Sequence, residues 1–247
     1  MTAINLDFNK KIIIGISGKL GTGKDTVAKF IKKKINDYKI NNVPLTTSII
    51  SFGDPLKNET STVYKFHKKL CYTQEGKESY IEFEMLPNDP RIPPNSKKIG
   101  INTYKNKVRI VLQWYGTDVK RKEDPNYWLK MMDQEILRLK NDPTIIIIPD
   151  VRFINEFNYI SKKPNNFNFR LEPYKNYIYG KNSNHASETE LDPYLNRFDC
   201  VFNPSFGTVH LKNVANDIYD QFIYNKCKEL FDNQNFRRIM RSMSINM

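Results

Sequence analysis

The feature that most constrains the fold is a glycine-rich segment near the amino end of the chain. Residues 18–24 read GKLGTGK, between an apolar run at residues 11–16 and a run with helical spacing of apolar residues after it. Glycines let a loop backbone wrap around a phosphate without clashes from Cβ atoms, and the amides of the loop and of the next helix point at the anion. A strand, this loop and a helix in that order predict a binding site for a nucleoside triphosphate.

The residues after the loop lysine depart from the general pattern, which has Ser or Thr there to hold Mg²⁺. This chain has Asp25, followed by Thr26. A carboxylate can contact the metal directly or through water, so Asp25 is the candidate metal ligand. Lys24 is a candidate catalytic residue, because its charge reaches the transferring group. A plain glycine-rich turn is the alternative interpretation. The candidate triphosphate-binding residues are Gly18, Gly21, Thr22, Gly23, Lys24, Asp25 and Thr26.

Apolar runs with strand character alternate with runs of helical spacing through the rest of the chain. We expect strands at about 11–16, 46–52, 145–148, 168–171 and 200–202. We expect helices at about 27–38, 108–114, 127–139, 153–160 and 211–231. This alternation predicts the α/β class, with a parallel sheet that carries helices on both faces.

The length of 247 residues and the hydrophobic content of 39% fit a single α/β domain with insertions. We expect one domain over 1–247, with a core at about 11–57 and 107–232. Residues 58–106 lose clear periodicity and collect prolines and charges, which indicates an insertion with one or two short helices at the edge of a site. The polar stretch at about 173–195 has the composition of a lid, and 233–247 is a basic tail.

Polar residues follow two of the expected strands at their carboxyl ends, where open α/β sheets bind ligands. Asp150 can position Mg²⁺ or a substrate hydroxyl, and Arg152 can face a phosphate. Asp54 and Lys57 follow the second strand and can meet the phosphate acceptor. A helix cap or turn aspartate beside a solvated cation remains the alternative for both pairs.

Two arginines bracket the segment 113–118, and we expect the polar residues 116–121 between two helices. Arg109 and Arg121 offer planar guanidinium groups that can bind a monophosphate. Arg121 is the stronger candidate of the two. We expect Arg121 and Arg152 to be catalytic. Gln113 offers a donor and an acceptor to a base edge.

His185 begins the block His185-Ala186-Ser187-Glu188 inside the expected lid. Neither a carboxylate nor a metal-ligand spacing marks it as a general base, so a surface position is the alternative to substrate binding. Glu156, in the block after Asp150, completes the candidate substrate-binding residues.

The formal charge of +12 and the isoelectric point near 9.4 indicate polyanionic partners. The lysines are dispersed over several faces and loops, so nucleotide-sized anions fit better than direct nucleic-acid binding. The three cysteines have no paired spacing, and no apolar run is long enough to cross a bilayer. We expect a reducing setting, the cytoplasm of a host cell or a viral factory, with no membrane partner.

Taken together, several blocks resemble the deoxynucleoside monophosphate kinases of bacteriophages and large viruses, and they come in the order of that family. The Gly-Lys-Asp form of the loop is itself a mark of the family. The resemblance leaves 58–106 and the tail unmatched. The blocks are 18–26, 51–57, Leu112-Gln113 with Gly116-Thr117 and Arg121, Asp150-Val151-Arg152-Phe153 with Asn155-Glu156, and 185–188.

The resemblance implies a P-loop nucleoside monophosphate kinase-like fold in three α/β/α layers, with a five-stranded parallel sheet, an acceptor-binding region and a lid. It implies transfer of the γ-phosphoryl group of ATP, with Mg²⁺, to a deoxynucleoside monophosphate. The loop residues would hold the triphosphate, Arg121 and Arg152 the phosphates, and Asp54, Lys57 and Gln113 the acceptor. Asn203 would lie near the adenine, at the start of 203–207.

Two other functions stay open at this point. A phosphomevalonate-kinase-like enzyme shares the Gly-Lys-Asp loop but acts on a small phosphate without a base. A nucleic-acid-associated P-loop ATPase would explain the basic surface and the arginines of the tail. The accepted bases, the role of 58–106 and a homodimer are likewise open.

Overall fold

The computed structural model describes residues 11–37, 39–40, 43–139, 145–174 and 185–232. The chain divides into two compact units. Unit 1 combines Met1–Ile50 with Leu137–Met247, and unit 2 is Ser51–Ile136. Unit 2 begins before and ends after the expected insertion at 58–106.

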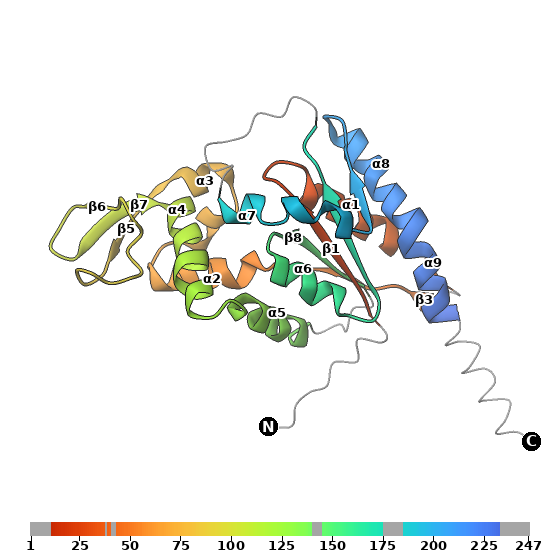
Figure 1. The fold of residues 1–247 in the computed structure, drawn as a ribbon, viewed down its shortest axis with the longest axis horizontal. Helices are drawn as coiled ribbons and strands as arrows, with labels where there is room; N and C mark the ends of the chain where they lie inside the picture. Colours follow the sequence, from red (N-terminus) through yellow and green to blue (C-terminus); the bar gives the residue numbers. More distant parts are fainter. Residues whose placement is uncertain (1–10, 38, 41–42, 140–144, 175–184, 233–247) are drawn as a thin grey trace, which may run out of the picture. The chain divides into compact units, whose positions relative to one another are not determined.

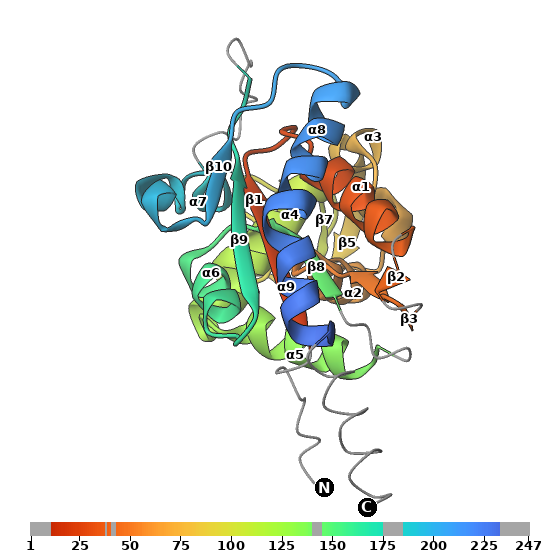
Figure 2. The same ribbon diagram turned by 90° about the vertical axis from the view of Figure 1, so that its right-hand side faces the viewer.

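Unit 1 is built on a sheet of five parallel strands in the order β10-β9-β1-β8-β4. The predicted five-stranded parallel sheet is therefore confirmed, with β1 in the centre (Figure 2). A separate antiparallel pair joins β2 and β3. The strands are β1 Ile12–Gly18, β2 Lys39–Ile40, β3 Val43–Pro44, β4 Thr47–Ile49, β8 Ile145–Val151, β9 Asn166–Leu171 and β10 Cys200–Phe202.

The helices of unit 1 follow its strands in an α/β alternation. Residues 208–232 form one continuous helical stretch, close to the predicted helix at 211–231. The helical elements are α1 Lys24–Asn36, α6 Ile154–Ser161, α7 Ala186–Thr189, η4 Asp192–Arg197, α8 Thr208–Ile218, η5 Tyr219–Ile223, α9 Tyr224–Cys227 and η6 Lys228–Asp232.

The central strand β1 shows why the sheet of unit 1 needs helices on both faces. Successive side chains of a strand point to opposite faces of the sheet, yet every residue of β1 is buried. Both faces of the sheet must therefore be covered. Ile12 and Ile14 pack in one cluster with α1 and α8 residues such as Ile31 and Ile218. On the other face, a Cβ on Gly15 would lie 2.7 Å from Ile160 Cδ1 of α6. Helices therefore cover both faces in three layers, and Figures 1 and 2 show α1 and α8 together on one side of the sheet.

Unit 2 combines helices with a small antiparallel sheet in the order β5-β7-β6 (Figure 1). Its core is aromatic: the ring of Tyr64 meets Phe83 edge-on at 5.1 Å and Tyr115 at 5.8 Å. The elements are α2 Gly53–Val63, η2 Lys68–Cys71, α3 Gln74–Glu78, β5 Tyr80–Glu84, β6 Lys97–Lys98, β7 Thr103–Lys107, α4 Val108–Gln113, η3 Trp114–Arg121 and α5 Tyr127–Leu137.

Unit 2 departs from two local expectations. The expected short helices of 58–106 are present as η2 and α3, but the segment also contains most of the antiparallel sheet, which the sequence analysis did not predict. The alternation of buried and exposed residues in β5 has the period of a strand. The polar segment at 116–121 is itself helical, within the π-helix η3. The Gly116 carbonyl of η3 accepts a hydrogen bond from Trp128 Nε1 of α5 at 2.9 Å, and this contact holds η3 against α5.

The second strand is shorter than predicted, because β4 ends at Ile49 and a helix begins at Gly53. Ser51 precedes that helix and accepts hydrogen bonds from its first amides. The Ser51 Oγ accepts from Gly53 N at 3.2 Å, and the Ser51 carbonyl accepts from Asp54 N at 3.1 Å. Pro55 in the first turn needs no amide partner. Asp54 and Lys57 therefore lie in a helix and not in a turn. No helix in the described part of the chain is both long and apolar enough to cross a membrane.

Candidate functional site

The loop between β1 and α1 has a backbone that requires glycine. Gly18 has φ +145°, and a Cβ there would lie 2.4 Å from the Leu171 carbonyl oxygen. Gly23, which precedes α1, has φ +89°, and its Cβ would lie 2.5 Å from Leu211 Cδ1. Both the dihedral angles and the packing exclude side chains, so the loop wraps closely between the sheet edge and α8.

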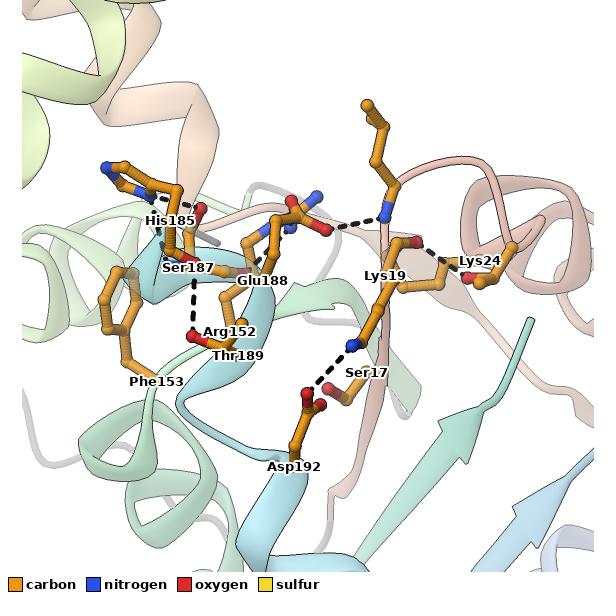
Figure 3. A network of polar contacts seen from close by, with 12 residues as sticks. Ser17, Lys19, Lys24, Arg152, Phe153, His185, Ser187, Glu188, Thr189 and Asp192 are labelled. Atoms are coloured by element: carbon orange, nitrogen blue, oxygen red, sulfur yellow. Dashed lines mark hydrogen bonds and ion pairs between the residues drawn. The ribbon is translucent and has the colours of Figure 1, made fainter. Parts of the chain in front are cut away.

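One carbonyl organises the interior of the loop. The Lys19 oxygen accepts from Lys24 Nζ at 2.7 Å, from Thr22 Oγ1 at 2.9 Å and from Thr22 N at 3.3 Å. The lysine side chain thus folds back along the loop that precedes it (Figure 3). Its ammonium group stays beside the amino end of α1, where backbone amides favour an anion.

Lys24 is a buried cation in a positive environment. Burial lowers its pKa to about 7, and the charge of Arg152 lowers it further than Arg170 does. Glu188 and Asp25 act in the opposite direction, but they do not cancel the effect of burial. A polyphosphate in the loop would supply the negative charge that this ammonium needs. The residues present therefore fit a nucleoside triphosphate.

The turn after β8 presents Arg152 beside the loop. Arg152 Nη1 donates to the Ser187 carbonyl at 3.0 Å and pairs with the Glu188 carboxylate. Glu156 is buried in α6, and its Oε2 accepts from Arg152 N at 2.8 Å and Phe153 N at 3.2 Å. These contacts hold the backbone of the turn. Asp150 is half-buried in β8, two residues before Arg152.

A second arginine, which unlike Arg152 is buried, contacts the start of the loop. Arg170 in β9 is 3% exposed and donates to Ser17 Oγ at 3.1 Å. It also pairs with Glu172 at 2.7 Å and with Asp192 at 2.5 Å. The other oxygen of Asp192 pairs with Lys19 Nζ at 2.9 Å (Figure 3). Asp192 therefore ties the loop to the buried guanidinium.

The segment that begins at His185 supplies the other carboxylate of the loop. His185 caps α7, where its Nδ1 accepts from Ser187 N at 3.2 Å and lies 2.9 Å from Ser187 Oγ. Glu188 Oε2 accepts from Leu20 N at 2.7 Å, while its Oε1 pairs with Arg152 (Figure 3). Residues 175–184 of the expected lid lie outside the described residues.

The candidate residues for Mg²⁺ and for the adenine are exposed or half-buried in unit 1. Asp25 is exposed and Thr26 is half-buried in the first turn of α1. Asn203 is exposed just after β10. No group of three or more His, Cys, Asp or Glu side chains among the described residues is arranged to hold a metal ion. Mg²⁺ in phosphoryl-transfer sites takes most of its ligands from phosphates and water, so one carboxylate suffices.

The remaining candidates belong to unit 2. Lys57 Nζ pairs with Asp54 Oδ1 at 2.9 Å one turn apart in α2. Arg109 in α4 is held by Glu78 at 2.5 Å and by Gln74 Oε1 at 2.7 Å. Gln113 ends α4. Arg121 ends η3, and its Nη1 lies 3.5 Å from the Pro125 carbonyl. The sequence candidates therefore separate into a triphosphate group in unit 1 and a group in unit 2.

Unit 2 also contains a carboxylate that the sequence analysis missed. Glu59 accepts from Tyr115 Oη at 2.6 Å and from Tyr127 Oη at 2.8 Å, and Lys120 Nζ lies 3.5 Å away. Burial, followed by the hydrogen bond to Glu59, raises the pKa of Tyr115 and raises that of Tyr127 to about 12. Both hydroxyls are therefore fixed as donors.

Three other charged residues of the site were also missed: Arg170, Glu188 and Asp192. Arg170 had a signal, because a cation in the run Phe167–Leu171 is out of place in a buried parallel strand. Glu188 stood in a block of the family resemblance without a role. Asp192 had no signal in the sequence, because its contact with Lys19 depends on tertiary structure.

Comparisons with known proteins identify the family of this chain. The family model for deoxynucleotide monophosphate kinases matches residues 56–203, which is more than half of the chain. The match includes 58–106, which the resemblance had left unmatched. A deoxynucleoside-5'-monophosphate kinase of Escherichia phage T5 is 27% identical over 176 residues, covering 59% of this chain and 70% of the relative.

A second relative comes from Acanthamoeba polyphaga mimivirus and is provisionally described as a deoxynucleotide monophosphate kinase. It is 24% identical over 163 residues, which cover 61% of this chain and 69% of the relative. Both relatives are viral, and both names agree with the family model. The chain belongs to the deoxynucleotide monophosphate kinase family.

Proposed function

We propose that this protein transfers the γ-phosphoryl group of ATP to the 5'-phosphate of a deoxynucleoside monophosphate, which yields ADP and the diphosphate. The observation that carries the proposal is the glycine loop with the buried Lys24, in a chain of this family. The expected supply role in DNA synthesis and the cytoplasmic setting follow from the same proposal.

Lys24 and Arg152 supply the positive charge that the transfer needs. Negative charge spreads over the γ-phosphoryl oxygens as the bond to the β-γ bridging oxygen breaks and the bond to the acceptor oxygen forms. Two fixed cations beside the loop stabilise that charge more than the ground state, because they are already oriented and desolvated. The acceptor phosphate is itself anionic, so the chain needs no general base.

Unit 2 supplies the acceptor side of the proposal. Arg121 would bind the phosphate of the acceptor, and Gln113 would bind the edge of its base. Asp54 and Lys57 of α2 would also contact the acceptor. Arg109 already pairs with Glu78, which an acceptor phosphate would have to replace. The segment around His185 would close over the nucleotides and exclude water.

Asp25 would hold Mg²⁺ together with the phosphates of the triphosphate, which Thr26 would help to bind. Asp25 is exposed in the first turn of α1, which suits a contact through water. When bound, the metal neutralises phosphate charge and fixes the geometry of the transferring group.

The test is ADP release by the full chain with ATP and each deoxy- and ribonucleoside monophosphate in turn. We expect turnover that requires a deoxynucleoside monophosphate. Lys24→Ala should reduce it by about 10³-fold, because a fixed charge on the transferring group is lost. Lys29→Ala is the matched control, since Lys29 is an exposed lysine of the same helix and turnover should not change.

Two results would contradict the proposal. Turnover with phosphomevalonate but with no nucleotide would favour the phosphomevalonate-kinase-like enzyme. ATP hydrolysis that is stimulated by single-stranded DNA and indifferent to monophosphates would favour the nucleic-acid-associated ATPase.

A further inference from the structure

The Glu188 carboxylate holds a backbone amide of the glycine-rich loop and also Arg152, which the proposed function assigns to phosphate. Its Oε2 accepts from the backbone N–H of Leu20, inside the loop, at 2.7 Å. Its Oε1 pairs with the guanidinium of Arg152. The Glu188 side chain is 11% exposed, so this contact is largely shielded from water.

A carboxylate and a phosphate are recognised by the same chemistry. Each presents anionic oxygens to a guanidinium and to backbone N–H groups, and arginine binds both in the same planar manner. Loop amides before a helix are an anion site. The loop therefore already holds an anion in this structure, and that anion belongs to the chain itself.

We propose that Glu188 is an internal substitute for a triphosphate oxygen, which occupies the loop without nucleotide and must leave when the triphosphate binds. The inference rests on the proposed function and adds a competing group to it. The single Leu20 N–H donates to one anion at a time, and two like charges would repel at contact distance in a shielded site. In this proposal, phosphate binding therefore displaces the Glu188 contact.

The structure favours exchange at Glu188 without loss of the whole segment. None of the residues of α7 is buried, so little packing opposes movement of this short helix. The residues just after it are firmly held: Glu190 Oε1 accepts from Ile154 N at 2.9 Å, and Leu191 is 2% exposed. Asp192 keeps its pairs with Lys19 and Arg170. Residues 190–192 can thus stay in place while Glu188 departs.

The first test is the affinity for a non-hydrolysable ATP analogue, measured by titration calorimetry on the full chain. Glu188→Ala should tighten binding about tenfold, because the competing closed state is removed. Glu188→Gln should tighten it less, since the amide oxygen can still accept from Leu20 N. Equal or weaker binding by these variants would overturn the inference.

Glu190→Gln is the matched control. It removes the same charge two residues away, but its contact is with Ile154 N and not with the loop. Its affinity for the analogue should stay within about twofold of the unmodified chain. If Glu190→Gln tightened binding as much as Glu188→Gln, general repulsion would explain the effect and the specific exchange would be refuted.

The second test uses the unmodified chain, so it does not depend on the folding of a variant. Carbodiimide coupling to glycine ethyl ester, read by mass spectrometry, measures which carboxylates are accessible. Glu188 should become more reactive when the analogue binds, whereas Glu190 should not. An unchanged or reduced reactivity of Glu188 with the analogue bound would refute the inference alone. Failure of the analogue to bind at all would refute the proposed function as well.

Discussion

The two units bury polar groups in opposite ways. Among the described residues, unit 1 buries the charged side chains of Lys11, Lys24, Glu156 and Arg170. The buried polar residues described in unit 2 are uncharged: Thr60, Ser61 and Asn106. Burying a charge is unfavourable unless a partner compensates it, so the difference needs an explanation.

The explanation lies in what each unit is built to hold. In unit 1 the buried cations Lys24 and Arg170 lie where the carboxyl ends of β1 and β9 meet the loop, whereas Lys11 lies at the amino end of β1. Carboxylates compensate them in part, and a bound polyphosphate would complete the compensation. In unit 2 aromatic rings provide the core, and the tyrosine hydroxyls reach Glu59 or a carbonyl. In the part of the chain that the structure describes, fully buried charged side chains lie only in the unit that we expect to bind the triphosphate.

The largest expected effect is the loss of the loop in unit 1. Gly18→Ala places a methyl group 2.4 Å from the Leu171 carbonyl at a φ of +145°, so β9 or the loop must move. We expect a loss of about 3 kcal/mol of stability and no measurable binding of the ATP analogue. Urea unfolding followed by circular dichroism, with calorimetry for binding, measures both.

Gly207→Ala is the control for that substitution. Gly207 also has a positive φ, +116°, but nothing lies within 4 Å of the added Cβ. Only the backbone strain remains, so the loss should be about 1 kcal/mol. Equal losses for the two variants would show that the close approach to Leu171 is not what requires glycine in the loop.

The next largest effect is on the free energy of unfolding, and it shows whether the buried charge of Lys24 destabilises the chain without nucleotide. The folded chain holds the pKa of Lys24 at about 7, below the ordinary value of 10.5, so the unfolded chain binds more protons between these values. The stability of the unmodified chain should therefore rise as the pH increases from 7 towards 10.5. Lys24→Met removes this dependence and should be more stable by about 2 kcal/mol at pH 6, with the difference vanishing near pH 10.5.

Lys24→Met leaves the Lys19 carbonyl satisfied, because Thr22 still donates to it through Oγ1 and N. Urea unfolding at several pH values measures the difference between the two proteins. A Lys24→Met protein that is less stable at pH 6 would mean that carboxylates such as Glu188 already compensate the ammonium without nucleotide. The contrast between the two units would then lose its main support.

Periodicity and the loop motif were enough to predict the five-stranded sheet of unit 1 and its main helices. Buried parallel strands such as β8 read as continuous apolar runs, and the loop has a fixed glycine spacing, so both are local signals. The charged network around the loop was not predictable in the same way. Asp192 meets Lys19 and Arg170 from distant positions in the sequence, and only the folded chain brings them together.

Unit 2 was predicted poorly because its local signals are short. β5 has five residues and β6 only two, which is near the lower limit for detecting alternation. The π-helix η3 contains Gly116 and Thr117, residues that favour turns over helices. Contacts made by the tertiary structure, such as Trp128 Nε1 to the Gly116 carbonyl, override that preference. The acceptor candidates are therefore less well defined than the loop.

The smallest expected effect lies in unit 2. Tyr115→Phe removes one hydrogen bond to Glu59, which keeps Tyr127 and Lys120 as partners. We expect a loss of about 1 kcal/mol. Both tryptophans of the chain, Trp114 and Trp128, lie in unit 2, so their fluorescence during urea unfolding reports on this unit.

Tyr72→Phe is the control, because Tyr72 is 52% exposed and its ring, which lies near Lys57, is retained. It should change neither the stability of unit 2 nor the affinity for the ATP analogue. Tyr115→Phe should likewise leave that affinity within about twofold, because no buried charge is altered. A weaker affinity would mean that the neutral network around Glu59 contributes to triphosphate binding. Our inference that only the unit with buried charges binds the triphosphate would then be wrong, even if both units remained folded.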